Sequence, residues 1–255
     1  MLYSKEEIIK WLDLYEVKHY VINDDLTVDV KGEVVLSGRN LIELPIQFGI
    51  TEGSFNCSYN NLTSLKGVPY KILGDFSCGY NELTSLQYCP KEVKGGFYCA
   101  VNQLTSIEGC PNDIPGTFYC GENKIISLKG GPIIVGDIFD CSQNQLTSLE
   151  YGPIEVGSVF NTSYNQLTSL NYCPKIVGND FYCNNNPLEY FDFTNLKCDF
   201  KGIFYHEGST IKQLTHLYSQ GQLGVDKKTL NNFLLNIKLE KILPMTEFTQ
   251  QKKKI

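Results

Sequence analysis

Apolar and polar positions recur along most of the chain with a fixed step of 21 residues. The step is clearest in a phenylalanine ladder: Phe55, Phe76, Phe97, Phe118, Phe139, Phe160 and Phe181. A cysteine follows two places later at Cys57, Cys78, Cys99, Cys120, Cys141 and Cys183, with Thr162 as the one substitute. A fixed period in the twenties is typical of a solenoid, in which each repeat packs only on its neighbours.

Other positions of the unit are also fixed. Apolar residues stand seven and ten places after each phenylalanine. The asparagines are Asn60, Asn81, Asn102, Asn123, Asn144, Asn165 and Asn186, and the prolines are Pro69, Pro90, Pro111, Pro132, Pro153 and Pro174. Val34 and Leu36 fall one step before Phe55 and Cys57, so we expect a degenerate first rung. The repeat is therefore predicted to span residues 33–192 in about eight rungs.

Alternate side chains of a strand face opposite sides, so Phe and Cys two places apart should share one face and form the core. The segment from Leu65 to Ile72 is short and contains a proline. It cannot hold a full α-helix, and we expect the side of each rung opposite the phenylalanine strand to be extended or 3₁₀-like. The asparagines are expected to bond backbone groups in the turn that leaves the sheet.

The unit x-x-x-F-x-C-x-x-N-x-L-x-x-L resembles the leucine-rich repeat, with Phe and Cys in place of two leucines. The sequence motif "NQLTSL", followed by "CP" or "GP", is similar to motifs in repeat proteins of large tailed phages and some bacteria. It is also similar to the repeat blocks of bacterial effector ubiquitin ligases. Those ligases carry a separate catalytic domain, for which this chain has no room. The resemblance implies a leucine-rich repeat solenoid of the α/β class, β-rich, with a curved parallel sheet and a concave recognition face.

Both ends are predicted to be caps. At the N-terminus, residues 4–15 have helical apolar spacing and a capping box of Ser4 and Glu7, and an alternating hairpin follows in an N-terminal cap over residues 1–32. Trp11 is expected to anchor this cap. Residues 193–255 are predicted to hold two amphipathic helices, beginning at Ser209 and Asp226, and a basic tail. These helices either form a C-terminal cap or bind a partner, and both alternatives stay open.

Ten cysteines in one chain could indicate disulfides, zinc or a catalytic thiol. Cysteines 21 residues apart on stacked strands form a line and not a tetrahedron, so we expect no metal. The three histidines lie outside the repeats, which leaves no base beside a thiol. We therefore expect a ladder of buried, reduced thiols, with a second and sparser ladder at Cys89, Cys110 and Cys173.

Charge and hydropathy narrow the class of partner. The N-terminus is acidic where a signal peptide would be basic, and no apolar run is long enough to span a membrane, so we expect a cytoplasmic protein. Residues 200–255 carry a net charge of +5, which leaves −11 for residues 1–199. Because an acidic solenoid repels phosphates, no nucleic acid is expected on it.

Recognition is expected at outward positions that vary while the core positions stay fixed. One such row lies between Phe and Cys, and another lies two residues after the Cys position. The candidate partner-binding residues are Tyr59, Tyr80, Tyr98, Tyr119, Asp140, Tyr164 and Tyr182. Tyrosine brings a large contact area with a polar tip and is enriched at interfaces.

The sequence contains no catalytic set, and no catalytic residue, cofactor or metal is assigned. The function expected is a non-enzymatic module that binds a protein partner, whose identity the sequence does not give. If the source is a phage, a host protein or a host-defence protein is the expected target. The alternative is a structural component of a virion or larger assembly. A monomer is expected in the first case.

Overall fold

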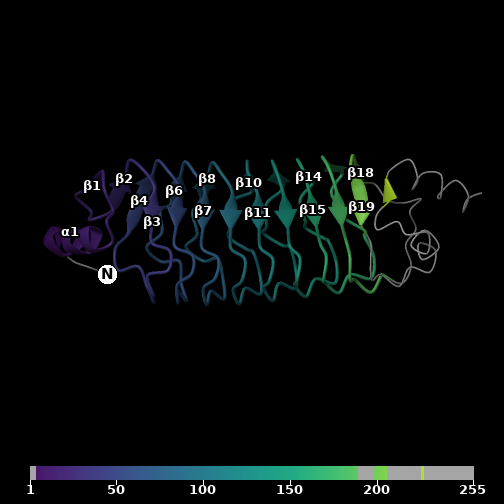
Figure 1. Cartoon of the computed structure of the whole chain (residues 1–255), viewed down its shortest axis with the longest axis horizontal. Coiled ribbons are helices and arrows are strands. Elements are labelled where there is room, and N and C mark those ends of the chain that lie inside the picture. The colour runs from purple at the N-terminus through teal and green to yellow at the C-terminus, as the bar shows by residue number, and fades with distance from the viewer. Residues whose placement is uncertain (1–3, 189–197, 206–224, 227–255) are drawn as a thin grey trace, which may run out of the picture.

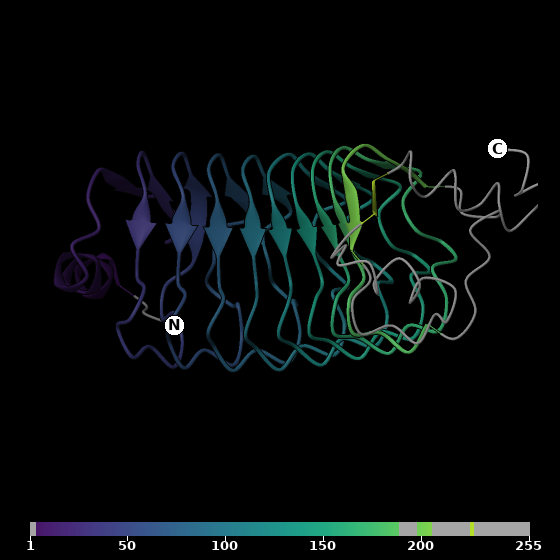
Figure 2. The ribbon, with the colours of Figure 1, turned by 45° about the vertical axis from the view of Figure 1, so that its right-hand side comes forward.

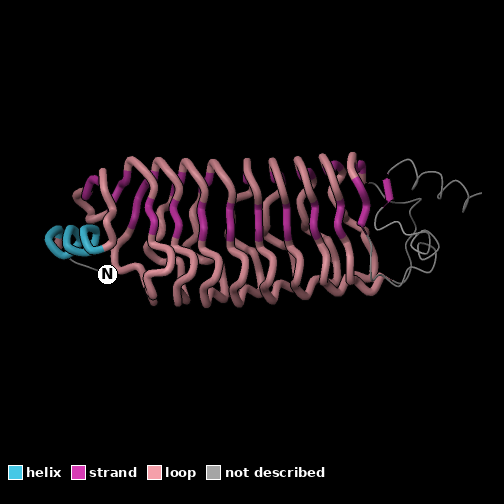
Figure 3. The backbone as a smooth tube through the Cα atoms, viewed as in Figure 1, coloured by secondary structure: helices cyan, strands magenta, loops and turns pink. Residues whose placement is uncertain are grey.

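The computed structural model describes residues 4–188, 198–205 and 225–226, and these form a β-solenoid of about eight turns. The rungs follow one another along the long axis of the molecule (Figure 1). Most of each rung is loop, with short strands at the same places in every turn (Figure 3). The regular structure of the chain therefore comes from the repetition of similar turns and not from long helices or strands.

The phenylalanine ladder forms one ten-stranded sheet, called here the long sheet. Its strands are β3 (Val34–Val35), β5 (Phe55–Asn56), β7 (Phe76–Ser77), β9 (Phe97–Tyr98), β11 (Phe118–Tyr119), β13 (Phe139–Asp140), β15 (Phe160–Asn161), β17 (Phe181–Tyr182), β19 (Ile203–Tyr205) and β20 (Val225–Asp226). All neighbours are parallel except β19 and β20. Phenylalanine faces phenylalanine across each repeat pair, as in Phe118 with Phe97 and Phe139. Figure 2 shows these strands side by side.

The opposite side of the solenoid carries two five-stranded sheets. The first contains β1 (Tyr20–Ile22), β2 (Val28–Val30), β4 (Phe48–Thr51), β6 (Lys71–Ile72) and β8 (Glu92–Val93). The second contains β10 (Asp113–Ile114), β12 (Ile134–Val135), β14 (Glu155–Val156), β16 (Ile176–Val177) and β18 (Asp199–Phe200). The extended form expected for this side is confirmed, and no 3₁₀ turn occurs in the described residues.

Pro115 explains why this side is split. At the same place in the next rung, the Gly136 N–H donates to the Ile114 carbonyl at 2.8 Å. Pro115 has no N–H to give to Val93, so the ladder between β8 and β10 lacks this bond.

Glycine is required further along this side of the solenoid, because a Cβ at Gly157 would collide with the carbonyl oxygen of Gly136.

The core is the space between the sheets, and the phenylalanines fill it. All seven ladder phenylalanines and Phe204 are buried, with neighbouring ring centroids 4.9 to 6.3 Å apart from Phe55 to Phe204. Buried aliphatic residues such as Val135 and Val156 come from the opposite side. Phe204 stands 23 residues after Phe181 and still pairs with it, so the ladder continues beyond the strict period.

The asparagine ladder has the structural role expected of it. Asn102 is buried, and its Oδ1 accepts a hydrogen bond from the Leu83 N–H at 2.9 Å in the preceding rung. Its Nδ2 donates to the carbonyls of Cys78, Cys99 and Ala100. The same pattern recurs at Asn81, Asn123, Asn144, Asn165 and Asn186. Each amide therefore ties one turn to the turn before it.

The cysteines of the main ladder are buried and free. Cys89 and Cys110 of the second ladder are also buried, whereas Cys173 and Cys198 are half-buried. Burial raises the pKa of the Cys57 thiol to about 12 and that of Cys89 to about 11. It also raises the pKa values of Cys78, Cys99, Cys120 and Cys141 well above the ordinary range.

These thiols are expected to be silent to iodoacetamide at pH 8 in the folded protein, because the reactive species is the thiolate. Cys173 and Cys198 should be alkylated first, and the interior thiols only after addition of urea. Peptide mapping by mass spectrometry measures each site. Labelling of Cys99 or Cys120 in native protein at the rate of Cys173 would contradict the buried ladder.

The predicted N-terminal elements are confirmed. Helix α1 (Lys5–Leu14) begins after the N-cap Ser4, and Ser4 and Glu7 form both bonds of a capping box. Strands β1 and β2 pair as an antiparallel hairpin, and β2 continues the first five-stranded sheet beside β4. Trp11 packs with its ring centroid 6.3 Å from that of Phe48. At the other end, Asp226 ends β20, and the two helices expected from Ser209 and Asp226 lie outside the described residues.

Candidate functional site

The outward side of the long sheet carries all the predicted site residues. It is called here the tyrosine face. In each rung it consists of the outward-facing residues in a seven-residue segment, which runs from two positions before the ladder phenylalanine to four positions after it. Residues 202–205 form its end. Strand pairing puts Tyr98 beside Tyr119, and Tyr119 beside Asp140. Tyr59, Tyr80 and Tyr164 lie in a second row, at the corner where the chain leaves the sheet.

The corner row has a left-handed backbone in every rung. Its residues are Tyr59, Tyr80, Val101, Glu122, Gln143, Tyr164 and Asn185, with φ between 54° and 56°. This region is uncommon outside glycine, and for the β-branched Val101 it is a marked outlier. From Tyr59 to Tyr164, the N–H groups of the corner residues donate to carbonyls of the next rung, as Tyr80 does to Ala100 at 2.9 Å. The repeat therefore fixes the backbone conformation at the corner position, while the amino acid at that position varies from rung to rung.

Two pairs of tyrosines on this face are stacked. The rings of Tyr59 and Tyr80 lie 4.1 Å apart and 12° from parallel. Tyr182 stacks on Tyr205 at 4.2 Å and 2°. Tyr59 and Tyr80 are 59% and 46% exposed, so this stack presents aromatic surface to a partner.

Tyr98 and Tyr119 are neighbours in the sheet, but their rings lean in opposite directions. The Tyr98 ring lies over Gly96, before its strand, and the Tyr119 ring lies over Gly121, after its strand. A Cβ on either glycine would approach the ring within 2.7 Å. Both tyrosines are half-buried.

Asp140 has a different role from the tyrosines. Its Oδ1 accepts from the Ser142 N–H at 2.9 Å, and its Oδ2 accepts from the Asn161 Nδ2 at 2.9 Å. Both carboxylate oxygens thus bond within the protein, and the residue is half-buried. Of the predicted site residues it has the clearest structural function.

Tyr205 is a residue of the face that the sequence period does not reach. It stacks on Tyr182, but it follows Tyr182 by 23 residues instead of 21. The signal that could have found it is the pair Phe204-Tyr205, which repeats the Phe181-Tyr182 pattern two residues late.

The charge on the tyrosine face is entirely negative in the described residues. It holds five acids, Asp75, Glu122, Asp137, Asp140 and Asp180, and no lysine or arginine. The seven lysines between residues 53 and 188 all lie elsewhere. The side chains of Asp75 and Asp180 each accept a backbone N–H of the next rung, from Gly96 and Ile203, at 2.7 Å. The repeat thus holds these carboxylates in place.

The tyrosines respond to this negative environment. Burial, followed by the charges of Asp75 and Asp137, raises the pKa of Tyr98. Burial, followed by Asp140 and Glu122, raises the pKa of Tyr119. The pKa of Tyr182 is raised to about 12 by burial, by its bond with Tyr205 and by Asp180. With their pKa values raised, the phenols of Tyr98, Tyr119 and Tyr182 remain neutral hydrogen-bond donors in the physiological range.

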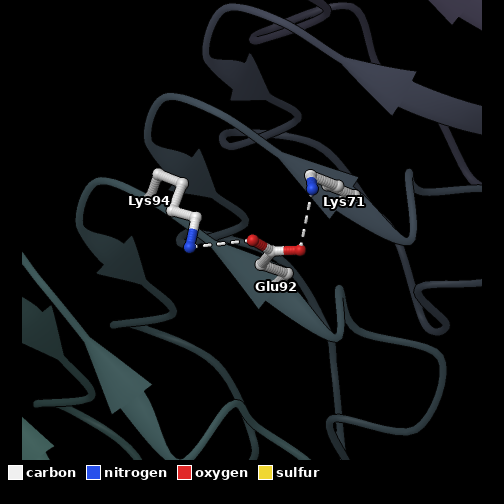
Figure 4. A network of polar contacts seen from close by, with 3 residues as sticks. All are labelled: Lys71, Glu92 and Lys94. Carbon is white, nitrogen blue, oxygen red and sulfur yellow. Dashed lines mark ion pairs between the residues drawn. The ribbon is translucent and has the colours of Figure 1, made fainter.

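The opposite side of the solenoid has a mixed character. Glu92 on β8 pairs with Lys71 at 3.0 Å and with Lys94 at 2.8 Å (Figure 4). Beyond the break at Pro115, exposed isoleucines occur on this side beside the charged residues Glu155 and Lys175. This isoleucine patch consists of Ile133, Ile134, Ile154 and Ile176.

In the described residues, no group of three or more His, Cys, Asp or Glu side chains is placed to hold a metal ion. Over the same residues, no helix is long and apolar enough to cross a membrane. In comparisons with protein-family models and with curated proteins, no match to the chain was found.

Proposed function

We propose that the protein is a binding module that recognises a protein partner through the tyrosine face. The observation that carries this proposal is the contrast between an invariant backbone and variable outward side chains. The seven corner residues have the same left-handed φ, and from Tyr59 to Tyr164 they bond to the next rung in the same way, yet the side chain ranges from tyrosine to glutamate.

The proposal includes the type of repeat. The order Phe-x-Cys-x-x-Asn-x-Leu, with the asparagine bonding the turn, supports a variant of the leucine-rich repeat. Helix α1 and its hairpin would then be the N-terminal cap that shields the first rung. Similarity to phage repeat proteins, and with it a host protein as target, belongs to the same proposal.

The test compares two pairs of tyrosines in capture experiments from a lysate of host or source cells. Tyr80→Ala with Tyr119→Ala should weaken the captured complex by roughly 2 kcal/mol or more, as expected for aromatic hot spots. The matched control is Tyr88→Ala with Tyr151→Ala. Those tyrosines are 54% and 58% exposed and also have positive φ, but they lie at another corner of the rung.

The control pair should bind like the unchanged protein. If the Tyr80 and Tyr119 variant retains every partner at unchanged affinity, the face assignment is wrong. If both variants lose the partner equally, recognition depends on tyrosines in general and not on this face.

The isoleucine patch favours a second function, as a component of a larger assembly. Ile134 on β12 and Ile176 on β16, with Ile133 and Ile154 just before β12 and β14, are a candidate surface for self-association, although Glu155 lies between Ile134 and Ile176. In that case Ile134→Lys with Ile176→Lys should convert an oligomer to a monomer in light scattering. A monomer at high concentration before any substitution would exclude self-assembly through this patch.

A further inference from the structure

We infer that the partner segment recognised by the tyrosine face is cationic, a stretch of polypeptide rich in lysine or arginine. This inference rests on the proposed function and specifies the chemistry of the partner. It is based on the observation that tyrosines and acids share one face, and that this face contains no lysine or arginine in the described rungs. Electrostatic complementarity selects a partner of opposite charge.

The tyrosines supply the first half of the recognition chemistry. A lysine ammonium or an arginine guanidinium is attracted to the face of an aromatic ring within about 6 Å of its centroid. In the stack of Tyr59 and Tyr80, each ring covers one side of the other, and the two residues remain 59% and 46% exposed. Ring faces held in fixed positions bind a cation without first losing conformational freedom.

The carboxylates supply the second half, and they are fixed in the same way. Asp75 uses one oxygen to accept the Gly96 N–H, and the exposed residue keeps a second oxygen for a partner. Glu122 is exposed at the corner, two rungs from Tyr80, and its charge acts on both Tyr80 and Tyr119. Glu122 follows Tyr119 by three residues in the same rung and stands in the corner row of Tyr80, so negative charge and aromatic side chains share this part of the face. Charge-assisted hydrogen bonds from lysine or arginine to carboxylates are stronger than neutral ones.

The opposite side of the solenoid differs from the tyrosine face in its charge distribution. There the acid Glu92 is neutralised by Lys71 and Lys94. On the tyrosine face the described acids have no lysine or arginine beside them, so their charge is available to a ligand. The opposite side therefore carries charges of both signs, whereas the tyrosine face carries negative charge alone in the described rungs.

The experiment uses the full chain and a fluorescein-labelled peptide of alternating lysine and glycine, followed by fluorescence anisotropy. The test variant is Asp75→Asn with Glu122→Gln; asparagine keeps the acceptor for the Gly96 N–H. The control is Glu108→Gln with Glu150→Gln, which removes the same charge from exposed positions at another corner. We expect the test variant to bind about tenfold more weakly and the control to bind as the unchanged protein does. The corresponding glutamine and glycine peptide should not bind, and high salt should weaken the lysine peptide.

Two outcomes would overturn the inference. One is equal affinity of the test and control variants for the lysine peptide. The other is tighter peptide binding after Lys252→Gln, Lys253→Gln and Lys254→Gln, because the occupant of the face would then be the basic tail of the chain itself. Failure of the proposed function is seen separately, when Tyr80→Ala with Tyr119→Ala leaves lysate capture unchanged. If those tyrosines matter for capture but the carboxylates do not, the face binds a partner that is not cationic.

Discussion

Phe118→Ala is expected to lower the free energy of unfolding by roughly 3–5 kcal/mol, the range for phenylalanine truncation in a core. Phe118 is completely buried, and its ring centroid lies 5.5 Å from that of Phe97 and 5.4 Å from that of Phe139. Removing the ring leaves a void between two neighbouring rings, and a rigid ladder held by backbone bonds cannot collapse to fill it. Urea denaturation measures the loss.

Controls separate packing from surface effects. Phe118→Leu keeps most of the volume and should cost clearly less than alanine. Ile126→Ala, at a residue 61% exposed, should change stability by less than about 0.5 kcal/mol. Hydrogen exchange should show the damage spreading to β9 and β13 before it reaches β3, because rungs couple to their neighbours. Uniform loss of protection along the whole chain would argue against this coupling.

Asn102→Asp is expected to have a comparable effect, at least about 3 kcal/mol at pH 7, although it changes one amide group to a carboxylate. The Oδ1 atom could still accept the Leu83 N–H. The second oxygen, however, would replace an Nδ2 that donates to the carbonyls of Cys78, Cys99 and Ala100. A buried negative charge would then face carbonyl oxygens without a donor.

The loss in Asn102→Asp should depend on pH in a defined direction. Burial and the facing carbonyls favour the neutral acid, so the folded pKa of the new carboxyl should lie above its unfolded value of about 3.9. The folded state then binds the proton more tightly. The variant should be least destabilised below that unfolded pKa, and its stability should fall as pH rises through the folded pKa. Gln103→Glu adds the same charge at the exposed neighbour, and it should change stability little at any pH between 4 and 8 (roughly 0.5 kcal/mol or less). A destabilisation of Asn102→Asp that does not vary with pH would contradict the buried carboxylate.

The core of this protein could be predicted from sequence because packing fixes it. Phe97 and Cys99 recur at 21 residues because stacked rungs demand the same shape in the same place, and the role of Asn102 follows from buried backbone that needs partners. The side opposite the long sheet was predicted only as extended or 3₁₀-like. Its division at Pro115 depends on one missing N–H, which the period alone does not mark.

The details of the face were harder to predict, because they arise from local backbone geometry. The left-handed corner is occupied by Tyr80 or Val101 as readily as by Gly38 in the first rung, so composition does not reveal it. The opposite leaning of Tyr98 and Tyr119 depends on which adjacent position is glycine. Strand alternation therefore placed these tyrosines on the outward side of the sheet but could not give the direction of their rings.

The uniform bonding from rung to rung has a consequence for how such a gene can change. A duplication or deletion of 21 codons would join two corners of identical conformation, and the amide of each asparagine would find the same carbonyls in its new neighbour. Rung number can therefore vary by recombination within the gene without a new fold having to be selected. Each such event would also shift which tyrosines and acids adjoin, so the lineage could sample new partners by rearranging rungs as well as by point mutation.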